Sequence, residues 1–138
     1  MRVVLDTNIF IAAALKGGFS EDIIKMAASK IVTIVCSEEI LDELHKKLVK
    51  KFKWNINDSK FFVDTVREIV EIGKVKKKIT LITRDPDDNK ILECAKEGNA
   101  TLIVSSDQDL IKLKNFENIA IVHPNTLHWI FPEYFKKK

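Results

Sequence analysis

The sequence feature that most constrains the fold is the alternation of short β-branched apolar runs with longer segments of helical period. Five runs have the length and composition of strands, at residues 2–5, 32–35, 79–82, 101–104 and 119–122. Strands separated by helices pair in parallel, and a parallel sheet is covered by helices on both faces. We therefore predict a three-layer α/β/α fold with a five-stranded parallel sheet, in a single domain over residues 1–138.

Two further helices in succession are predicted between the second and third strands, where they would form a helical arm. Ser37 is expected to open the first, whose apolar face would hold Ile40, Leu41, Leu44, Leu48 and Phe52. The second is expected to follow Asn57, with an apolar face of Phe61, Phe62, Val66, Ile69 and Val70. A later helix should begin at Asp85-Pro86, in the order of cap and first helical residue, and end near Gly98.

Composition narrows the class of protein but does not identify its function. The apolar fraction of 46% suffices for one hydrophobic core, and no stretch reaches the roughly 20 apolar residues of a membrane span. We expect a cytoplasmic protein without membrane contact. The net charge of +3 does not mark a nucleic-acid binder, and the lysine runs are more simply solvated faces than phosphate contacts.

Asp6 is the first acidic residue that solubility alone does not explain. It follows an apolar strand, so its carboxylate would lie at the carboxyl end of a parallel sheet, where open α/β sheets bind ligands. The alternative is a turn residue, with Asn8 as the cap of the next helix. From the residues alone the two interpretations are level.

Asp88 is distinguished from its acidic neighbours by helical periodicity. Asp88, Ile91 and Leu92 share one face, so Asp88 belongs to the buried stripe of its helix. Asp87 is turned about 100° away from that stripe, and Asp85 is the expected cap. A carboxylate on a core-facing stripe must be paired or bind a metal.

Asp107 repeats this pattern after the fourth predicted strand. Asp107, Leu110 and Ile111 share a face at the start of the next helix. A cap is the alternative role, although Ser106 could fill that position instead. Asp109 lies off this face but close enough to contribute.

These acids would converge on one edge of the sheet. Converging hard oxygen ligands favour Mg²⁺ or Mn²⁺ over zinc. Glu43 lies off the apolar stripe of its helix, so the residues alone favour a solvated glutamate there.

Four segments resemble the acidic motifs of the PIN-domain nuclease family, in the family's order. They are VVLDTN at 3–8, SEEILDEL at 37–44, DNKILECA at 88–95 and VSSDQDL at 104–110. The resemblance implies that Asp6, Glu43, Asp88 and Asp107 are the catalytic carboxylates that hold the metal, and it alone selects Glu43 over Glu39 and Asp42. The sequence departs from the pattern at Ser106 and Leu110, where relatives often have basic and aromatic residues, which leaves substrate contacts open.

The resemblance also implies an activity, a cofactor and partners. Similar proteins hydrolyse RNA, often as toxins restrained by an antitoxin, so we expect a Mg²⁺- or Mn²⁺-dependent endoribonuclease with RNA and an antitoxin as partners. Asp6 would be the shared metal ligand, with Asp88 and Glu43 on one side and Asp107, assisted by Asp109, on the other. The remaining expected contacts are ligand or water orientation by Thr7, Asn8, Ser105 and Ser106, and RNA binding by Arg84 and Lys46.

Two other functions fit part of the pattern. An aspartate-dependent phosphatase usually has a second acid two residues after its nucleophile, and Asn8 stands there. A non-catalytic nucleic-acid or protein binding module would use these acids only as helix caps, and its stability would not depend on metal. The aromatic segment 129–135 is expected to seal the core, the alternative being a surface for a homodimer or an antitoxin.

Overall fold

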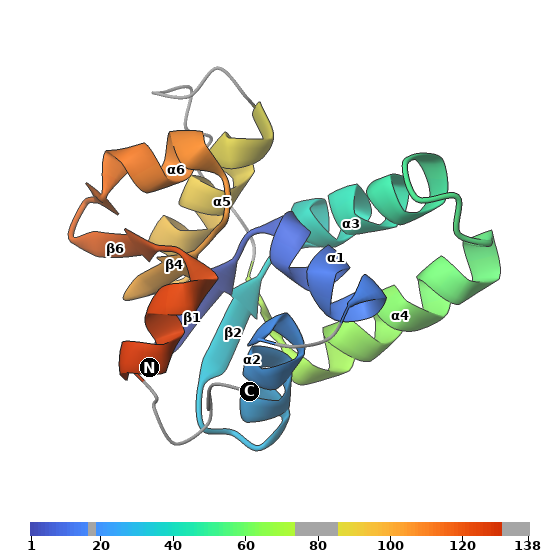
Figure 1. Cartoon of the computed structure of the whole chain (residues 1–138), viewed down its shortest axis with the longest axis horizontal. Helices are drawn as coiled ribbons and strands as arrows, with labels where there is room; N and C mark the ends of the chain where they lie inside the picture. Colours follow the sequence, from blue (N-terminus) through green and yellow to red (C-terminus); the bar gives the residue numbers. More distant parts are fainter. Residues whose placement is uncertain (17–18, 74–85, 131–138) are drawn as a thin grey trace.

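A computed structural model describes residues 1–16, 19–73 and 86–130 of the chain, shown in Figure 1. The strand predicted at 79–82 and the predicted RNA contact Arg84 lie outside the described residues. The strands are β1 (Arg2–Leu5), β2 (Thr33–Cys36), β3 (Glu71–Ile72), β4 (Leu102–Val104), β5 (Asn115–Phe116) and β6 (Ile119–Val122). The helices are α1 (Thr7–Leu15), α2 (Phe19–Ala28), α3 (Glu38–Lys50), α4 (Ile56–Ile69), α5 (Pro86–Glu97), α6 (Gln108–Leu113), the short 3₁₀ helix η1 (Pro124–Thr126) and α7 (Leu127–Ile130).

The sheet has the strand order β3-β2-β1-β4-β6-β5, and every neighbouring pair is parallel except β5 with β6. The predicted α/β class is confirmed, but the prediction of five strands, all parallel, is wrong in number and at this edge. Glu117 and Asn118 both have positive φ, of 46° and 70°, and form the two-residue turn that reverses the chain between β5 and β6. Such turns favour glycine, and the absence of glycine at both positions explains why the sequence did not reveal the hairpin.

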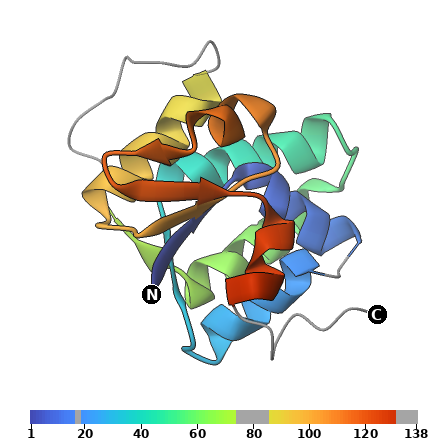
Figure 2. The same ribbon diagram turned by 60° about the vertical axis from the view of Figure 1, so that its left-hand side comes forward.

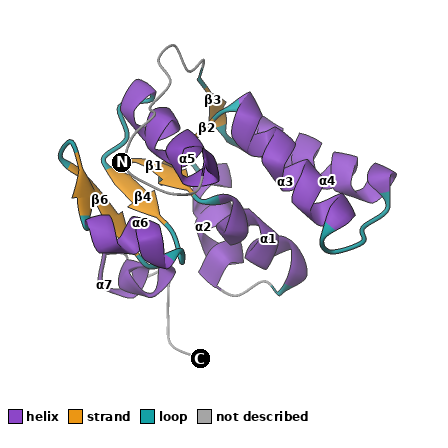
Figure 3. Cartoon of the chain, turned by 90° about the horizontal axis from the view of Figure 1, so that it is seen from above, coloured by secondary structure: helices purple, strands orange, loops and turns teal. Residues whose placement is uncertain are grey.

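Both faces of the central strands are covered. Val3, Val4 and Leu5 of β1 are all buried, as expected for a strand in the middle of a parallel sheet. Helix α5 packs on β1, β2 and β4. Figure 3 shows α5 on one side of the sheet and α1, α2 and α7 on the other, and Figure 2 shows the same layers from the side. This arrangement leaves the carboxyl ends of β1 and β4 together at one edge.

Gly98 follows the end of α5, as predicted, but it does not adopt the left-handed conformation of a glycine cap. A Cβ atom at this position would lie 2.3 Å from Cγ1 of Val35 in β2. The residue with positive φ is Asn99, at 53°. Glycine is therefore required by the close approach of the helix end to the sheet.

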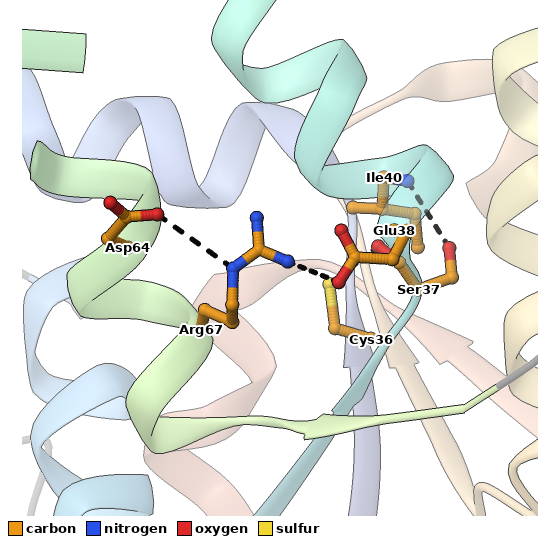
Figure 4. A network of polar contacts seen from close by, with 6 residues as sticks. All are labelled: Cys36, Ser37, Glu38, Ile40, Asp64 and Arg67. Carbon is orange, nitrogen blue, oxygen red and sulfur yellow. Dashed lines mark hydrogen bonds and ion pairs between the residues drawn. The ribbon is translucent and has the colours of Figure 1, made fainter. Parts of the chain in front are cut away.

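Helices α3 and α4 form the predicted arm, which projects to one side of the sheet in Figures 1 and 3. Ser37 caps α3 as expected, with its Oγ accepting the N–H of Ile40 at 3.2 Å. At the base of the arm, Arg67 of α4 forms an ion pair with Glu38 of α3, and its Nε lies 3.9 Å from Oδ1 of Asp64 (Figure 4). The arm is thus fixed where it leaves the sheet.

The far end of the arm differs from the prediction. Helix α4 begins at Ile56, capped by Asn55, rather than after Asn57. Phe61 was predicted on the buried face, yet it is 76% exposed, and Phe52 lies beyond the end of α3 and is also exposed. The buried residues of α4 are Ser59, Val63 and Val66, and at 100° per residue Phe61 lies on the opposite face of the helix.

The C-terminal described segment also departs from its prediction. Trp129 is 86% exposed and does not seal the core, whereas Leu127 is buried there. Residues 131–135 of the predicted aromatic segment lie outside the described residues. Among the helices that the structure describes, none combines the length and apolar character needed to cross a membrane.

Candidate metal centre

Two neighbouring strands place the first and fourth acidic motifs side by side. Leu5 of β1 pairs with Val104 of β4, so Asp6 and Ser105 leave the sheet together. The Ser105 hydroxyl is fully buried, donates to Oδ2 of Asp6 at 2.6 Å and accepts the N–H of Asp107 at 2.9 Å. Ser105 therefore couples the positions of the two aspartates.

Asp6 is a buried carboxylate, only 6% exposed, that also caps α1 through a hydrogen bond of 3.2 Å from the N–H of Asn8 to Oδ1. Burial raises the pKa of Asp6 above its ordinary value, and repulsion from Asp107 acts in the same direction. Hydrogen bonds from Ser105 and Asn8 and the charge of Lys47 oppose this rise. Ionisation of Asp6 therefore costs free energy in the protein alone, and a cation bound nearby would favour the ionised form.

Asp88, Asp107 and Asp109 bring one carboxylate oxygen each to within 4.8 Å of one another. Asp88 is buried, as its periodicity predicted, and the other two are half-buried. Among the described residues this is the one group of acids, histidines or cysteines with such proximity. Three hard oxygen donors at this spacing fit a divalent cation such as Mg²⁺ or Mn²⁺.

Asp107 combines this position with the role of helix cap. Its Oδ1 accepts the N–H groups of Asp109 at 2.8 Å and Leu110 at 3.2 Å, at the start of α6. The suggestion that Ser106 would be the cap is wrong, because Ser106 is exposed and precedes the cap. Both bonds use Oδ1, so the cap does not engage Oδ2.

Glu43 is near this edge but outside the group of three carboxylates. Its side chain is only 16% exposed, and Oε2 lies 3.7 Å from Nζ of Lys90 on α5. Lys90 is two residues after Asp88, so the ion pair joins the second motif to the third. The expectation of a solvated glutamate from spacing alone is wrong.

The other predicted residues are distributed unevenly around the site. Thr7 is buried at the start of α1, while the side chains of Asn8, Ser106 and Lys46 are exposed. Of the four residues expected to orient ligands, Ser105 is the one with a side-chain hydrogen bond to a proposed ligand.

Sequence reasoning missed one residue at this edge and one buried acid on α5. Lys47 is half-buried and its charge lowers the pKa of Asp6, whereas its neighbour Lys46 was predicted. Its spacing of four residues from Glu43 on α3 could have revealed it. Glu93, on α5, is buried although no role was assigned to it.

A family model described as PIN domain matches residues 2–109. The chain belongs to the PIN-domain family. This confirms the resemblance to that family, and it places the chain among proteins that are generally nucleases and typically use divalent metals. An uncharacterized protein of Methanocaldococcus jannaschii is 28% identical over 119 residues, which cover 83% of this chain and 76% of that protein.

A solved structure shares the fold of this PIN domain. It is the crystal structure of VapBC2 from Rickettsia felis bound to a DNA fragment from their promoter, with a TM-score of 0.66 and 23% identity. The match covers 89% of this chain and 98% of the other. At this identity the likeness concerns the fold alone.

Proposed function

We propose that this PIN domain is a Mg²⁺- or Mn²⁺-dependent endoribonuclease that hydrolyses RNA phosphodiester bonds. The observation that carries the proposal is the convergence of Asp88, Asp107 and Asp109 within 4.8 Å, beside the buried Asp6. Helix caps alone give no reason for three acids from two different motifs to meet. A metal-binding nuclease centre does.

Asp88, Asp107 and Asp109 would hold the metal, with Asp6 joined to them through Ser105. The metal, when bound, supplies Lewis acidity that lowers the pKa of a water molecule and stabilises charge on a leaving oxygen. Glu43 belongs to the proposed site by family resemblance, and its ion pair with Lys90 holds it beside the first turns of α5.

The surrounding residues fix the carboxylates before any cation arrives. Ser105 orients Asp6 through its donated hydrogen bond and holds the backbone of Asp107 through the one it accepts. Lys47 moderates the negative charge near Asp6. Because these contacts already exist, the donors need little rearrangement to bind a metal.

The test is cleavage of a fluorescent single-stranded RNA by protein purified free of bound partners, with Mg²⁺, Mn²⁺ or chelator. We expect cleavage with metal and no cleavage in chelator. Asp88→Asn should lower the cleavage rate by at least about 100-fold, because replacing a residue that only hydrogen-bonds a metal ligand already lowers activity by about 10- to 100-fold. Asp42→Asn is the matched control, because Asp42 lies in the second motif but is exposed. RNA binding without cleavage would favour the binding module, and hydrolysis of a phosphate monoester alone would favour the phosphatase.

We further propose that a partner protein restrains this nuclease, as an antitoxin restrains a toxin. The support is the shared fold with VapBC2 of Rickettsia felis, which was crystallised as a complex on promoter DNA. Coexpression with the product of the adjacent reading frame should yield a copurifying complex whose RNA cleavage is suppressed. Full cleavage by the coexpressed preparation would contradict this partner.

A further inference from the structure

We infer that the tip of the α3/α4 arm binds unpaired bases of a single-stranded RNA whose phosphodiester lies at the carboxylate cluster. The arm tip is defined by the residues that line an open hollow of about 520 Å³, namely Lys53, Trp54, Asn55, Asp58, Phe61 and Phe62. The inference rests on the proposed nuclease function and adds a second point of contact for its substrate.

The first observation is exposed aromatic surface at the tip. Phe61 is 76% exposed and lines the hollow, beside Phe62 and Trp54, whose rings meet edge to face at 6.0 Å. Trp54 and Phe62 are half-buried against the core, so they fix the floor while Phe61 presents its ring to solvent. Exposed rings of this kind serve as stacking platforms for bases, because every base offers a π-face.

The second observation is the positive charge of residues 46–60, which lead along α3 to the tip and form part of it. Residues 46–60 contain six lysines and one aspartate, a net charge of +5, whereas the whole chain carries only +3. Lys51 reaches over the ring of Phe52, with its Nζ 5.6 Å from the centroid. Lysines that alternate with exposed rings match a single-stranded polyanion with unstacked bases better than they match an apolar protein surface.

The third observation is that α3 leads from the carboxylates to the tip. Glu43 of α3 pairs with Lys90, and Lys47 acts on Asp6, so the middle of the helix lies beside the acidic edge. Seven residues separate Glu43 from Lys50, the last residue of α3, about 10 Å along a helix at 1.5 Å per residue, and the arm tip lies beyond this end. At about 3.4 Å per stacked nucleotide, a strand must therefore be longer than about three nucleotides to reach from the cluster to the tip.

An ion pair and a hydrogen bond between α3 and α4 hold the tip in a defined position relative to the carboxylate cluster. Arg67 of α4 pairs with Glu38 at the base (Figure 4), and His45 Nδ1 lies 2.8 Å from Oγ of the fully buried Ser59 at mid-length. A contact at the tip would therefore fix the position of a strand along α3 relative to the carboxylate cluster.

The experiment measures RNA binding by fluorescence anisotropy in chelator, so that cleavage does not interfere. Phe61→Ala should weaken binding of a 12-nucleotide single-stranded RNA by roughly 5- to 150-fold, the loss expected for one stacked base. The wild type should bind a 3-nucleotide RNA much more weakly than the 12-nucleotide RNA, because the short strand cannot reach both sites. Trp129→Ala is the control, since Trp129 is an equally exposed aromatic outside the arm.

Salt dependence separates the aromatic from the electrostatic contribution. Phe61→Ala should leave the slope of log affinity against log salt unchanged, while Lys53→Gln should reduce it by about 0.7, the share of one phosphate contact. Lys30→Gln, an exposed lysine after α2, should not alter it.

Unchanged 12-nucleotide binding in Phe61→Ala, or an equal loss in Trp129→Ala, would overturn the inference. A change of oligomeric state or of partner-protein binding in Phe61→Ala, with RNA affinity intact, would instead assign the tip to protein contact. If the wild type cleaves RNA and Phe61→Ala binds RNA as tightly as the wild type, only the role of the arm tip is refuted. If Phe61→Ala weakens RNA binding but the wild type does not cleave RNA with any metal tested, only the nuclease function is refuted.

Discussion

Replacing Asp107 by asparagine isolates the charge of the carboxylate cluster from the structure that surrounds it. Both hydrogen bonds that Asp107 makes as a helix cap, from the N–H groups of Asp109 and Leu110, go to Oδ1. Asparagine has such an oxygen and is as good a helix cap as aspartate. Asp107→Asn should therefore keep the cap, the side-chain shape and the position of the backbone, and should remove only the charge.

The electrostatic consequence can be worked from the spacing of the cluster. Carboxylate oxygens of Asp88 and Asp109 lie within 4.8 Å of that of Asp107. At this separation and an effective dielectric near 20, each pair of charges repels by about 3.5 kcal/mol. Solvent screening of the half-exposed side chains reduces this figure, and loss of a charge at a helix N-terminus costs about 0.3–1 kcal/mol.

We expect a net stabilisation of at least about 1 kcal/mol in chelator, which raises the Tm by about 3–5 °C for a chain of this size. Bound metal reverses the order. At a Mn²⁺ concentration about 100 times its Kd, the wild type should gain about 2.7 kcal/mol, and Asp107→Asn should gain much less. Asp107→Ala, which also removes the cap, should lie about 0.5–2 kcal/mol below Asp107→Asn in chelator.

Thermal melts of the three proteins in chelator and in Mn²⁺ decide the matter. If Asp107 is only a helix cap, Asp107→Asn melts with the wild type or slightly below it in chelator, and both proteins shift equally in Mn²⁺. That result would refute the view that the three carboxylates form a strained, cation-binding group.

Two further predictions follow from individual contacts. Burial raises the pKa of Asp6 above its ordinary 3.8, so the folded protein retains a proton that the unfolded chain loses. In chelator, the free energy of unfolding should therefore fall as pH rises from about 4 through the raised pKa. Asp6→Asn should remove this part of the pH dependence. Urea unfolding across that range checks this, and parallel curves for the two proteins would count against it. Gly98→Ala should lower the free energy of unfolding by about 1–3 kcal/mol, because its Cβ would lie 2.3 Å from Cγ1 of the buried Val35. In a Val35→Ala background the same replacement should lower it by less. An equal loss in both backgrounds would show that the contact with Val35 is not the cause.

Helical periodicity predicted the burial of Asp88, because a residue that shares a stripe with Ile91 and Leu92 must face the same layer. The same argument failed for Glu43. A helix stripe describes the face toward the sheet, whereas Glu43 is enclosed by the neighbouring helix through Lys90. Contacts between helices distant in sequence leave no periodic trace, which is why only family resemblance pointed to Glu43.

Periodicity also placed Phe61 on the wrong face of α4. The residues of this helix that reach the core are Ser59, Val63 and Val66, and Phe61 lies on the opposite face, so it is exposed. The β5–β6 hairpin went unpredicted for a different reason: Glu117 and Asn118 adopt positive φ without the glycine that is usual in such a turn. The spacing of apolar residues alone defined neither the face of α4 that meets the core nor the end of β5.

The cap and the metal ligand were posed as alternatives for Asp6 and Asp107, yet both residues have the geometry of a cap at the edge where the acids gather. The two roles support each other. A carboxylate whose orientation is fixed by backbone N–H groups loses little freedom when it binds a cation. Helices α1 and α6 begin at this edge, and α5 has Asp88 in its first turn, so the positive ends of three helix dipoles face the accumulated negative charge. The fold thereby offsets part of the repulsion that the cluster would otherwise suffer before a metal binds.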